Sequence, residues 1–377
     1  MKIREVKTLL AFGGRQTWVF VLIETDAGIT GIGEASMEGK ELAIQAAVGE
    51  LARFLIGRDP TRIEQNWQIM YRHGFWRGGV VLNTALSGIE QALWDIAGKE
   101  LGAPVYRLLG GACRDQVQLY THCGGRSPDD LARNAQALVA KGWRALKIGS
   151  LGFEHFANEG QCVESATRHV RALREAVGPE VMLMMDAHGR HTPTQAIRLA
   201  RALEPFDLFF LEEPVPPDNV DAFKRLAEAG LNINIATGER LFTKWGYREL
   251  LERQYVDIIQ PDVCHDGGIL ETRKIAAMAE TYYVRVAPHN PNGPVATAAS
   301  VQLGACLPNF VILEYALNQP WRDQVLQKPL EIVNGYVALP TEPGLGVELN
   351  YEAIVKMPYK PLDYSGAFWP DGGVADI

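Results

Sequence analysis

The amino-acid sequence predicts an α/β protein in which a parallel barrel of eight strands follows an α+β unit. Three observations carry this prediction. The chain has 377 residues, more than the roughly 100–200 residues of one typical domain, so two domains are expected. Its first part reads as strands followed by helices, which is typical of an α+β unit. After about residue 116, short apolar strands alternate with helical patterns, which favours a parallel barrel.

The α+β unit is expected over residues 1–116. Its strands are VKTLLAF and WVFVLIETDAGITGIGEAS, where apolar and polar residues alternate around a turn at residues 26–28. Residues 40–56 place apolar side chains at helical spacing, and residues 83–101 do so more strongly. The Gly-Ala-Pro sequence at 102–104 ends that second helix.

The barrel is expected over residues 117–327. A dinucleotide-binding open sheet is the weaker alternative, because no G-x-G-x-x-G segment opens a helix after a strand. Helices of about 12–18 residues separate most of the strand candidates. These candidates are VQLYTHC, ALKIG, VMLMMDAH, LFFLEEP, INIATGE, IIQPDV, VRVAPH and FVILEY.

The last segment, residues 328–377, is expected to return to the N-terminal unit. It contains one clear local signal, the hairpin pattern LEIVNGYVAL with Asn334-Gly335 at its turn. A tail rich in proline and glycine follows.

Composition narrows the class of function. The net charge of −8 would repel phosphate and argues against nucleic-acid binding. The sequence has no signal-peptide pattern and no apolar run of about 18 residues, so a cytoplasmic protein without a membrane segment is expected. The five cysteines are scattered and show no CxxC spacing, which fits free thiols in a reducing compartment.

Three consecutive strand candidates end in a carboxylate. Asp186, Glu212 and Glu239 are separated by 26 and 27 residues, about one βα unit each. Active sites of such barrels lie at the C-terminal ends of the strands, so the three side chains should converge. Converging carboxylates repel one another unless a cation neutralises them, and oxygen ligands without a thiolate favour Mg²⁺. The sequence therefore predicts a magnesium site.

Two histidines and two acids complete the candidate catalytic set. His188 lies two residues after Asp186 and so on the same face of the chain. His289 ends the strand VRVAPH, and Asp262 ends the strand before it; a carboxylate beside a histidine makes a general base. Glu314, on the last strand, is a hydrogen-bonding candidate. His265 lies close to Asp262 and is a candidate substrate contact.

This set suits the removal of a proton next to a carboxylate. That proton is very weakly acidic, and a divalent cation lowers the barrier by stabilising the charge that develops. If a hydroxyl occupies the next carbon, an acid must protonate it as it leaves. His289 and His188 would supply base and acid.

The strand-end motifs MMDAHGR, FLEEPV, ATGER, QPDVCHDGG, APHNPNGP and LEY resemble the mandelate racemase/muconate-lactonizing branch of the enolase superfamily. The resemblance extends to IETDAGITGIGEAS and FWRGG…GIEQALWDIAGK near the N-terminus. Within the branch, the D-x-H-G-R run and the spacing from His289 to Glu314 are most similar to the D-galactonate dehydratases.

The resemblance implies a modified (β/α)₇β TIM-type barrel under an α+β capping domain that the C-terminal segment completes. It implies Mg²⁺ at Asp186, Glu212 and Glu239, and a small-molecule acid sugar as partner. It further implies His188 as the acid, His289 with Asp262 as the base, and Glu314 bonded to the intermediate; a lysine or histidine base beside Mg²⁺ is a known property of the superfamily. The product would be a 2-keto-3-deoxy sugar acid. A homo-oligomer is also implied.

Two alternatives stay open. Racemases and lactonizing members of the branch carry Lys-x-Lys on the second barrel strand, whereas this chain has Lys147-Ile148-Gly149. Lys147 is then a contact of the substrate carboxylate, or a base if the register shifts by two. A racemase or epimerase of an α-substituted acid is the first alternative, and a non-catalytic metal-binding barrel is the second. Trp76 and Arg77, in a loop of the capping domain, are candidate pocket-closing residues.

Overall fold

The computed structural model describes residues 1–149, 159–317, 319–362, 367–368 and 371–375. Its N-terminal part, called the cap here, is an antiparallel sheet in the order β1 (Ile3–Phe12), β2 (Thr17–Thr25), β3 (Thr30–Glu34). Three helices accompany it, α1 (Glu41–Ala52), α2 (Ile63–Arg72) and α3 (Val80–Leu101). Glycines bring β3 close to α3, since a Cβ on Gly33 would lie 2.0 Å from the Gly88 carbonyl oxygen.

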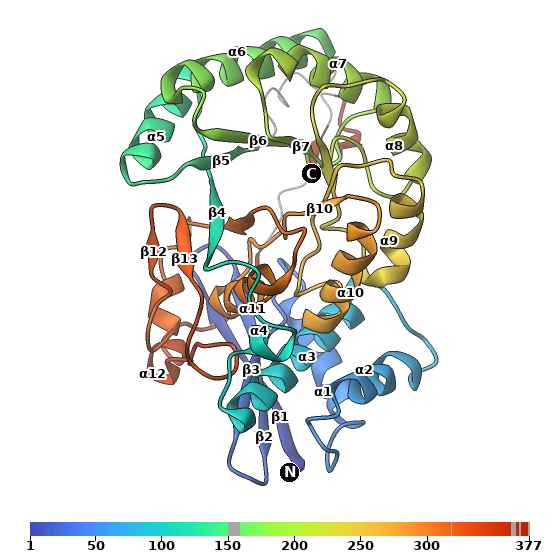
Figure 1. Cartoon of the computed structure of the whole chain (residues 1–377), viewed down its shortest axis with the longest axis vertical. Coiled ribbons are helices and arrows are strands. Elements are labelled where there is room, and N and C mark those ends of the chain that lie inside the picture. The colour runs from blue at the N-terminus through green and yellow to red at the C-terminus, as the bar shows by residue number, and fades with distance from the viewer. Residues whose placement is uncertain (150–158, 318, 363–366, 369–370, 376–377) are drawn as a thin grey trace.

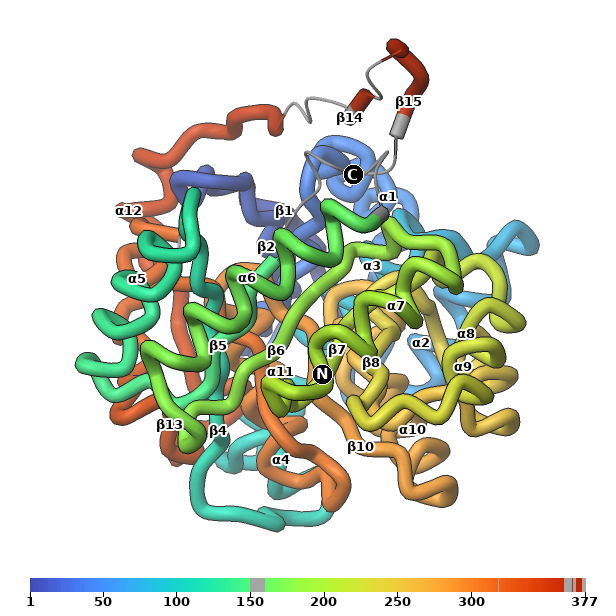
Figure 2. The backbone as a smooth tube through the Cα atoms, turned by 90° about the horizontal axis from the view of Figure 1, so that it is seen from above, coloured from blue at the N-terminus to red at the C-terminus, as the bar shows by residue number. Residues whose placement is uncertain are grey.

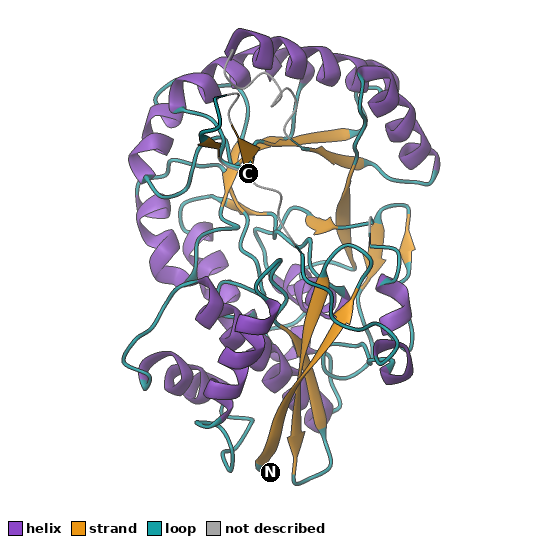
Figure 3. Cartoon of the chain, turned by 180° about the vertical axis from the view of Figure 1, so that it is seen from behind, coloured by secondary structure: helices purple, strands orange, loops and turns teal. Residues whose placement is uncertain are grey.

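The barrel begins after the short helix α4 (Val105–Leu108) and consists of parallel strands β4 to β11 with helices outside them (Figures 1 and 3). Strands β4 to β10 pair in sequence order, and β11 pairs with β4. A bridge between Val286 and Phe310 joins the β10 and β11 segments, which closes the ring. Seen from above in Figure 2, helices α5 to α10 follow one another around it. The predicted fold class is therefore correct.

The eight strands match the eight candidates of the sequence. In order they are β4 (Gln116–His122), β5 (Ala145–Ile148), β6 (Met182–Asp186), β7 (Phe210–Glu212), β8 (Ile235–Thr237), β9 (Ile258–Ile259), β10 (Arg285–Val286) and β11 (Leu313–Tyr315). The helices between them are α5 (Pro128–Ala140), α6 (Glu159–Val177), α7 (Pro193–Leu203), α8 (Val220–Ala227), α9 (Thr243–Glu252), α10 (Ile269–Glu280) and α11 (Pro294–Cys306).

One layer of side chains fills the inside of the barrel. It takes one buried residue from each strand segment: Tyr120, Ala145, Met184, Phe210, Ala236, Ile258, Ala287 and Ile312. Side chains of a strand alternate between faces, so the residue two positions further on also points inward. Those next residues are His122, Lys147, Asp186, Glu212, Gly238, Gln260, His289 and Glu314. The strand period thus places a polar layer directly above an apolar one, at the C-terminal end.

The C-terminal segment contacts both parts of the molecule. The expected hairpin forms from β12 (Ile332–Val333) and β13 (Tyr336–Ala338). The hairpin joins the barrel sheet and not the cap sheet, because β13 pairs antiparallel with residues 116–118 of β4. Beyond it, α12 (Tyr351–Ile354) returns to the cap as expected and lies beside β1 (Figure 2). None of the described helices is long and apolar enough to cross a membrane.

Three buried acids of the cap, Glu34, Glu90 and Asp95, lie at the seam with the rest of the chain and are called the seam carboxylates here. Glu34 accepts hydrogen bonds from the backbone N–H groups of Gly293 (2.6 Å) and Ala296 (2.8 Å), at the N-terminus of α11. Glu90 accepts from Ile269 N (2.7 Å) and Leu270 N (2.9 Å), at the N-terminus of α10.

Neither α10 nor α11 has a capping side chain of its own, since glycine precedes each of them. A Cβ on Gly268 would lie 2.2 Å from Glu90 Oε2, and one on Gly293 would lie 2.5 Å from Glu34 Oε1. The glycines make room for carboxylates that satisfy free N–H groups and the positive helix end. The cap therefore supplies the N-caps of two barrel helices.

Candidate metal and proton-transfer site

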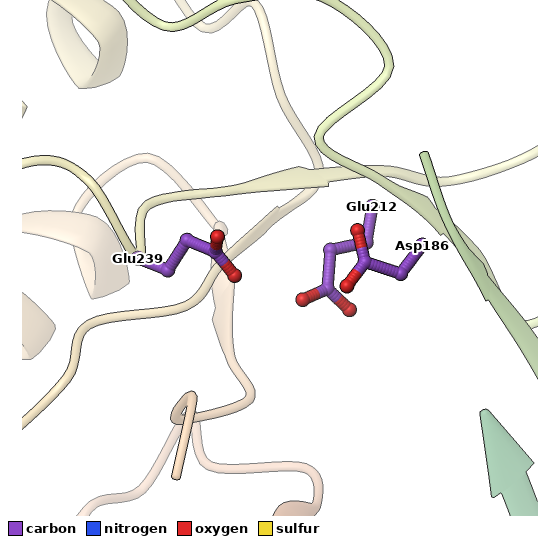
Figure 4. Close-up of side chains that lie close together, drawn as sticks. All are labelled: Asp186, Glu212 and Glu239. Carbon is purple, nitrogen blue, oxygen red and sulfur yellow. The ribbon is translucent and has the colours of Figure 1, made fainter. Parts of the chain in front are cut away.

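Asp186, Glu212 and Glu239 converge at the C-terminal end of the barrel (Figure 4). Parallel pairing of β6 with β7 sets Asp186 beside Glu212. Glu239 follows β8 after Gly238, whose φ of 144° and lack of a side chain let the chain turn; a Cβ there would lie 2.9 Å from Gln260 N. Each acid offers an oxygen, and these oxygens lie within 4.8 Å of one another.

The three acids fit a hard divalent cation. Asp186 and Glu212 are buried, and the Glu239 side chain is 16% exposed. Burial, followed by the charge of Asp186, holds the pKa of Glu212 well above its ordinary value. Burial likewise raises the pKa of Glu239 to about 7. Such a cluster of acids gains from an added cation, and carboxylate oxygens are the ligands that Mg²⁺ prefers.

Lys147 is the cation nearest to this cluster among the described residues. Its Nζ lies 2.8 Å from Glu212 Oε1, 2.9 Å from Glu314 Oε1 and 3.5 Å from Asp186 Oδ2. Burial opposes the charge of Lys147, yet these acids outweigh it and hold its pKa well above the ordinary value. Although burial raises the pKa of Asp186, Lys147 and a hydrogen bond from His188 lower it overall.

His289 and Asp262 form the expected pair. His289 Nδ1 lies 2.8 Å from Asp262 Oδ2, and the carboxylate also accepts hydrogen bonds from Asn292 Nδ2 and from the Cys264 N–H. Since Nδ1–H is donated to the carboxylate, Nε2 is the nitrogen left for proton transfer. It lies 3.2 Å from Glu239 Oε2 and 3.8 Å from Glu314 Oε2. Burial lowers the pKa of His289, but Glu239 and Glu314 raise it more.

His188 faces the cluster from the other side. Its backbone is left-handed, with φ of 50°, and its Nε2 lies 3.0 Å from Asp186 Oδ2. The next residue, Gly189, leaves the space that Arg240 Nη2 occupies, 2.1 Å from where a Cβ would be. Arg240 in turn binds Glu213 at 2.5 Å. These contacts account for the aspartate, histidine and glycine of the D-x-H-G-R run, and they keep Glu213 outside the cluster.

Sequence reasoning passed over His122 and Asn292. His122 ends β4, and its Nε2 contacts Glu314 Oε1. Its strand-end position was a visible signal, but its acid partner stands 192 residues away. Asn292 donates to both oxygens of Asp262, at 3.0 and 2.9 Å.

The remaining candidates take other places. Trp76 is 82% exposed, and Arg77 lies 5.6 Å above the ring of Tyr71 within the cap. Among the described residues no contact joins either of them to the three acids. The His265 side chain is 12% exposed and lies between Asp262 and Thr84 of α3.

A capped parallel barrel whose converging carboxylates could hold a metal ion, with a histidine beside two of them, defines a class of barrel enzyme. The chain belongs to the mandelate racemase/muconate lactonizing enzyme family of the enolase superfamily. Residues 2–110 match the mandelate racemase/muconate lactonizing enzyme N-terminal domain, and residues 130–354 match the enolase C-terminal domain-like family.

Relatives of known name support this assignment. The chain is 41% identical over 368 residues to the D-galactonate dehydratase of Variovorax paradoxus (strain S110), covering 95% of this chain and 96% of that one. It is 38% identical over 381 residues to the D-galactonate dehydratase of Xanthomonas euvesicatoria pv. vesicatoria (strain 85-10), covering 99% and 100%.

Solved structures agree with the fold. A putative dehydratase from Mesorhizobium loti has a TM-score of 0.90 at 40% identity, covering 96% of this chain and 99% of that one. An enolase from Pantoea ananatis with bound D-gluconate and Mg has a TM-score of 0.92 at 35% identity, covering 99% of both. A putative galactarate dehydratase from Agrobacterium radiobacter, with bound Na and L-malate, has a TM-score of 0.95 at 34% identity over the full length of both chains.

Proposed function

We propose that the chain is a Mg²⁺-dependent sugar-acid dehydratase that converts an aldonic acid of the galactonate type into a 2-keto-3-deoxy acid. The observation that carries the proposal is the placement of His289 and His188 on two sides of one carboxylate cluster. The names of the relatives at about 40% identity support the substrate class.

Mg²⁺ would be held by Asp186, Glu212 and Glu239, and when bound it would stabilise negative charge developing on the substrate carboxylate. His289 Nε2 takes the proton from the carbon next to that carboxylate, because its other nitrogen is committed to Asp262. The electron pair of the broken C–H bond becomes the new C=C bond. The C–O bond to the 3-hydroxyl breaks as this double bond forms between the two carbons, and His188 supplies the proton that makes the leaving group water.

The resulting enol tautomerises to the keto acid, so the overall change is loss of one water. Lys147 and Glu314 act as contacts of the substrate. Glu314 also lies within 2.9 Å of Lys147 Nζ, and the lysine cation would favour a substrate oxygen beside it. The Lys147 geometry speaks against the racemase alternative, since a base on the second face would need a free amine and this Nζ faces three carboxylates.

A screen of aldonic and aldaric acids with Mg²⁺ and a keto-acid readout tests the proposal, with D-galactonate and D-gluconate first. Keto acid should appear with wild type and be lost in His289→Asn. Exchange of the α-proton with D₂O but no keto acid would replace the dehydratase by a racemase or epimerase. Mg²⁺ binding without exchange on any acid would indicate a non-catalytic barrel.

We also propose, from the family resemblance alone, that the enzyme forms a homo-oligomer. Light scattering after size-exclusion chromatography measures the mass directly. A species near the chain mass of 41.6 kDa would contradict this proposal.

A further inference from the structure

His265 is enclosed by protein groups on both ring nitrogens. Its Nδ1 lies 2.9 Å from Thr84 Oγ1, and its Nε2 lies 3.6 Å from Asp262 Oδ2. The backbone N–H of His265 also donates to the Asp262 carbonyl oxygen, at 2.9 Å, which fixes the turn after β9. Thr84 thus occupies Nδ1, and Nε2 faces the Asp262 carboxylate.

The chemistry of the partners sets the tautomer of His265. Burial lowers the pKa of His265 and favours the neutral ring, which carries one N–H. An ionised carboxylate can only accept, so the N–H faces Asp262 from Nε2, and Nδ1 accepts from the Thr84 hydroxyl. At 3.6 Å the contact with Asp262 is too long for a hydrogen bond, but the N–H dipole still points at a buried negative charge.

Asp262 Oδ2 therefore lies between two imidazoles. His289 Nδ1 approaches it at 2.8 Å and His265 Nε2 at 3.6 Å, while Asn292 holds both oxygens. The Asp262 side chain is fully buried, and these contacts set its orientation together with the Cys264 N–H, which donates to Oδ1 at 2.7 Å. Its orientation in turn sets the direction of His289 Nε2.

This series of contacts, from His289 through Asp262 and His265, ends at a residue of the cap. Thr84 lies in the first turns of α3, is fully buried, and contacts the loop between β9 and α10 only through docking of cap on barrel. We propose that Thr84 and His265 are positioning residues that align Asp262 and hence the base His289, so that the base is fully oriented only when α3 is docked. This rests on the proposed role of His289 as the base.

The test uses full-length enzyme with Mg²⁺ and the acid sugar found by the screen. Thr84→Val keeps the shape and removes the hydroxyl, Thr84→Ser restores it, and His265→Leu removes both ring nitrogens. Residues that orient a metal-bound side chain through a hydrogen bond typically change activity by about 10–100-fold when they are replaced. We take this range as the guide for residues that orient the base. We expect kcat per Mg²⁺-binding site to fall by about tenfold in Thr84→Val and by more in His265→Leu, with KM changed by less than about threefold. Thr84→Ser should recover most of kcat.

Ser87→Ala is the matched control. Ser87 lies one turn further along α3 and is also buried; its Oγ accepts from the Gly267 N–H of the same loop at 2.9 Å, but it does not touch His265. Its kcat per site should equal that of wild type. Substrate deuterated at the α-carbon adds a second readout: the isotope effect on kcat in Thr84→Val should be at least as large as in wild type, because proton abstraction is the slowed step.

Three outcomes would overturn the inference. A rise in KM with kcat unchanged in His265→Leu would make His265 a substrate contact. Equal kcat in Thr84→Val and Ser87→Ala, or an isotope effect that disappears in Thr84→Val, would remove the link from cap to base. Failure of the proposed function is distinct, since wild type itself would then release no keto acid.

Discussion

Two groups of three carboxylates behave differently in this molecule. The mouth carboxylates, Asp186, Glu212 and Glu239, offer oxygens within 4.8 Å of one another. Glu34 and Glu90 at the seam instead point at separate helix ends and accept from backbone N–H groups, while Asp95 accepts from Ile32 N and Leu345 N and pairs with Lys99 at 2.7 Å.

The two groups differ in the partners that satisfy or neutralise their carboxylates. Backbone N–H groups at the ends of two barrel helices satisfy Glu34 and Glu90, which thereby dock the cap on the barrel. Lys99 and two backbone N–H groups satisfy Asp95 within the chain itself. The mouth carboxylates repel one another and have Lys147 and two histidines as counter-charges, so they gain from an added cation. Burial of an acid therefore does not indicate a metal; convergence of several oxygens does.

The largest effect is expected for Glu239→Gln. Loss of one charged ligand should weaken Mg²⁺ binding on the order of 100-fold and lower activity on the order of 1000-fold, because a bound ion supplies several kcal/mol to the transition state. Titration calorimetry and the keto-acid assay measure both. Glu34→Ala, a seam variant, is the control and should keep wild-type affinity. Unchanged affinity in Glu239→Gln would remove it from the ligand set.

Glu34→Ala should instead lower the free energy of unfolding, by about 3 kcal/mol, because it leaves the N–H groups of Gly293 and Ala296 buried and unpaired. Urea denaturation monitored by circular dichroism gives the value. Glu50→Ala, which removes an exposed acid of α1, should change it by less than about 0.5 kcal/mol. Equal stability of the two variants would show that the seam does not depend on Glu34.

Glu90→Gln should change how stability depends on pH. Burial raises the pKa of Glu90 from 4.5 to about 8, so the folded state binds its proton more tightly than the unfolded state. Its contribution is complete below pH 4.5 and is lost as the pH rises to about 8. A permanently neutral glutamine should remove this decline, which is on the order of 5 kcal/mol, as measured by urea denaturation at several pH values. Parallel curves for variant and wild type would contradict the assignment.

Ser36→Ala should have the smallest effect. The Ser36 hydroxyl donates to Glu34 Oε1 at 2.6 Å and accepts from Val19 N at 3.1 Å. Its removal should lower the free energy of unfolding by about 1 kcal/mol, the typical value of one buried hydrogen bond. Urea denaturation measures this value too. If Ser36→Ala lowered the free energy of unfolding as much as Glu34→Ala, the stabilisation by Glu34 would come from its bond with Ser36 and not from its bonds with the N-terminus of α11.

The sequence predicted the barrel and its acids because each apolar strand ends at its functional residue. Asp186 and Glu212 needed only strand period and spacing, whereas Glu239 was found from spacing alone, because Gly238 holds the inward position of its strand. The seam was hidden, since Glu34 ends a cap strand and Glu90 lies within a helix, and their helix partners stand 259 and 179 residues further along the chain. His122 was missed for the same reason, because it meets Glu314 only when the barrel closes. The hairpin was predicted correctly, but its pairing with β4 depends on how far that strand extends before its barrel partners begin.

Strand β4 has a consequence for synthesis on the ribosome. It pairs with β11 and β13, through Leu119 with Leu313 and Gln118 with Tyr336. About 200 residues separate these partners, so at about 5–20 residues per second the nascent β4 waits on the order of 10–40 s for them. The cap waits as well, because Glu34 needs the N-terminus of α11. The cap and the barrel are therefore both completed near the end of translation. A chain that stopped before α11 would contain neither a complete cap nor a complete barrel.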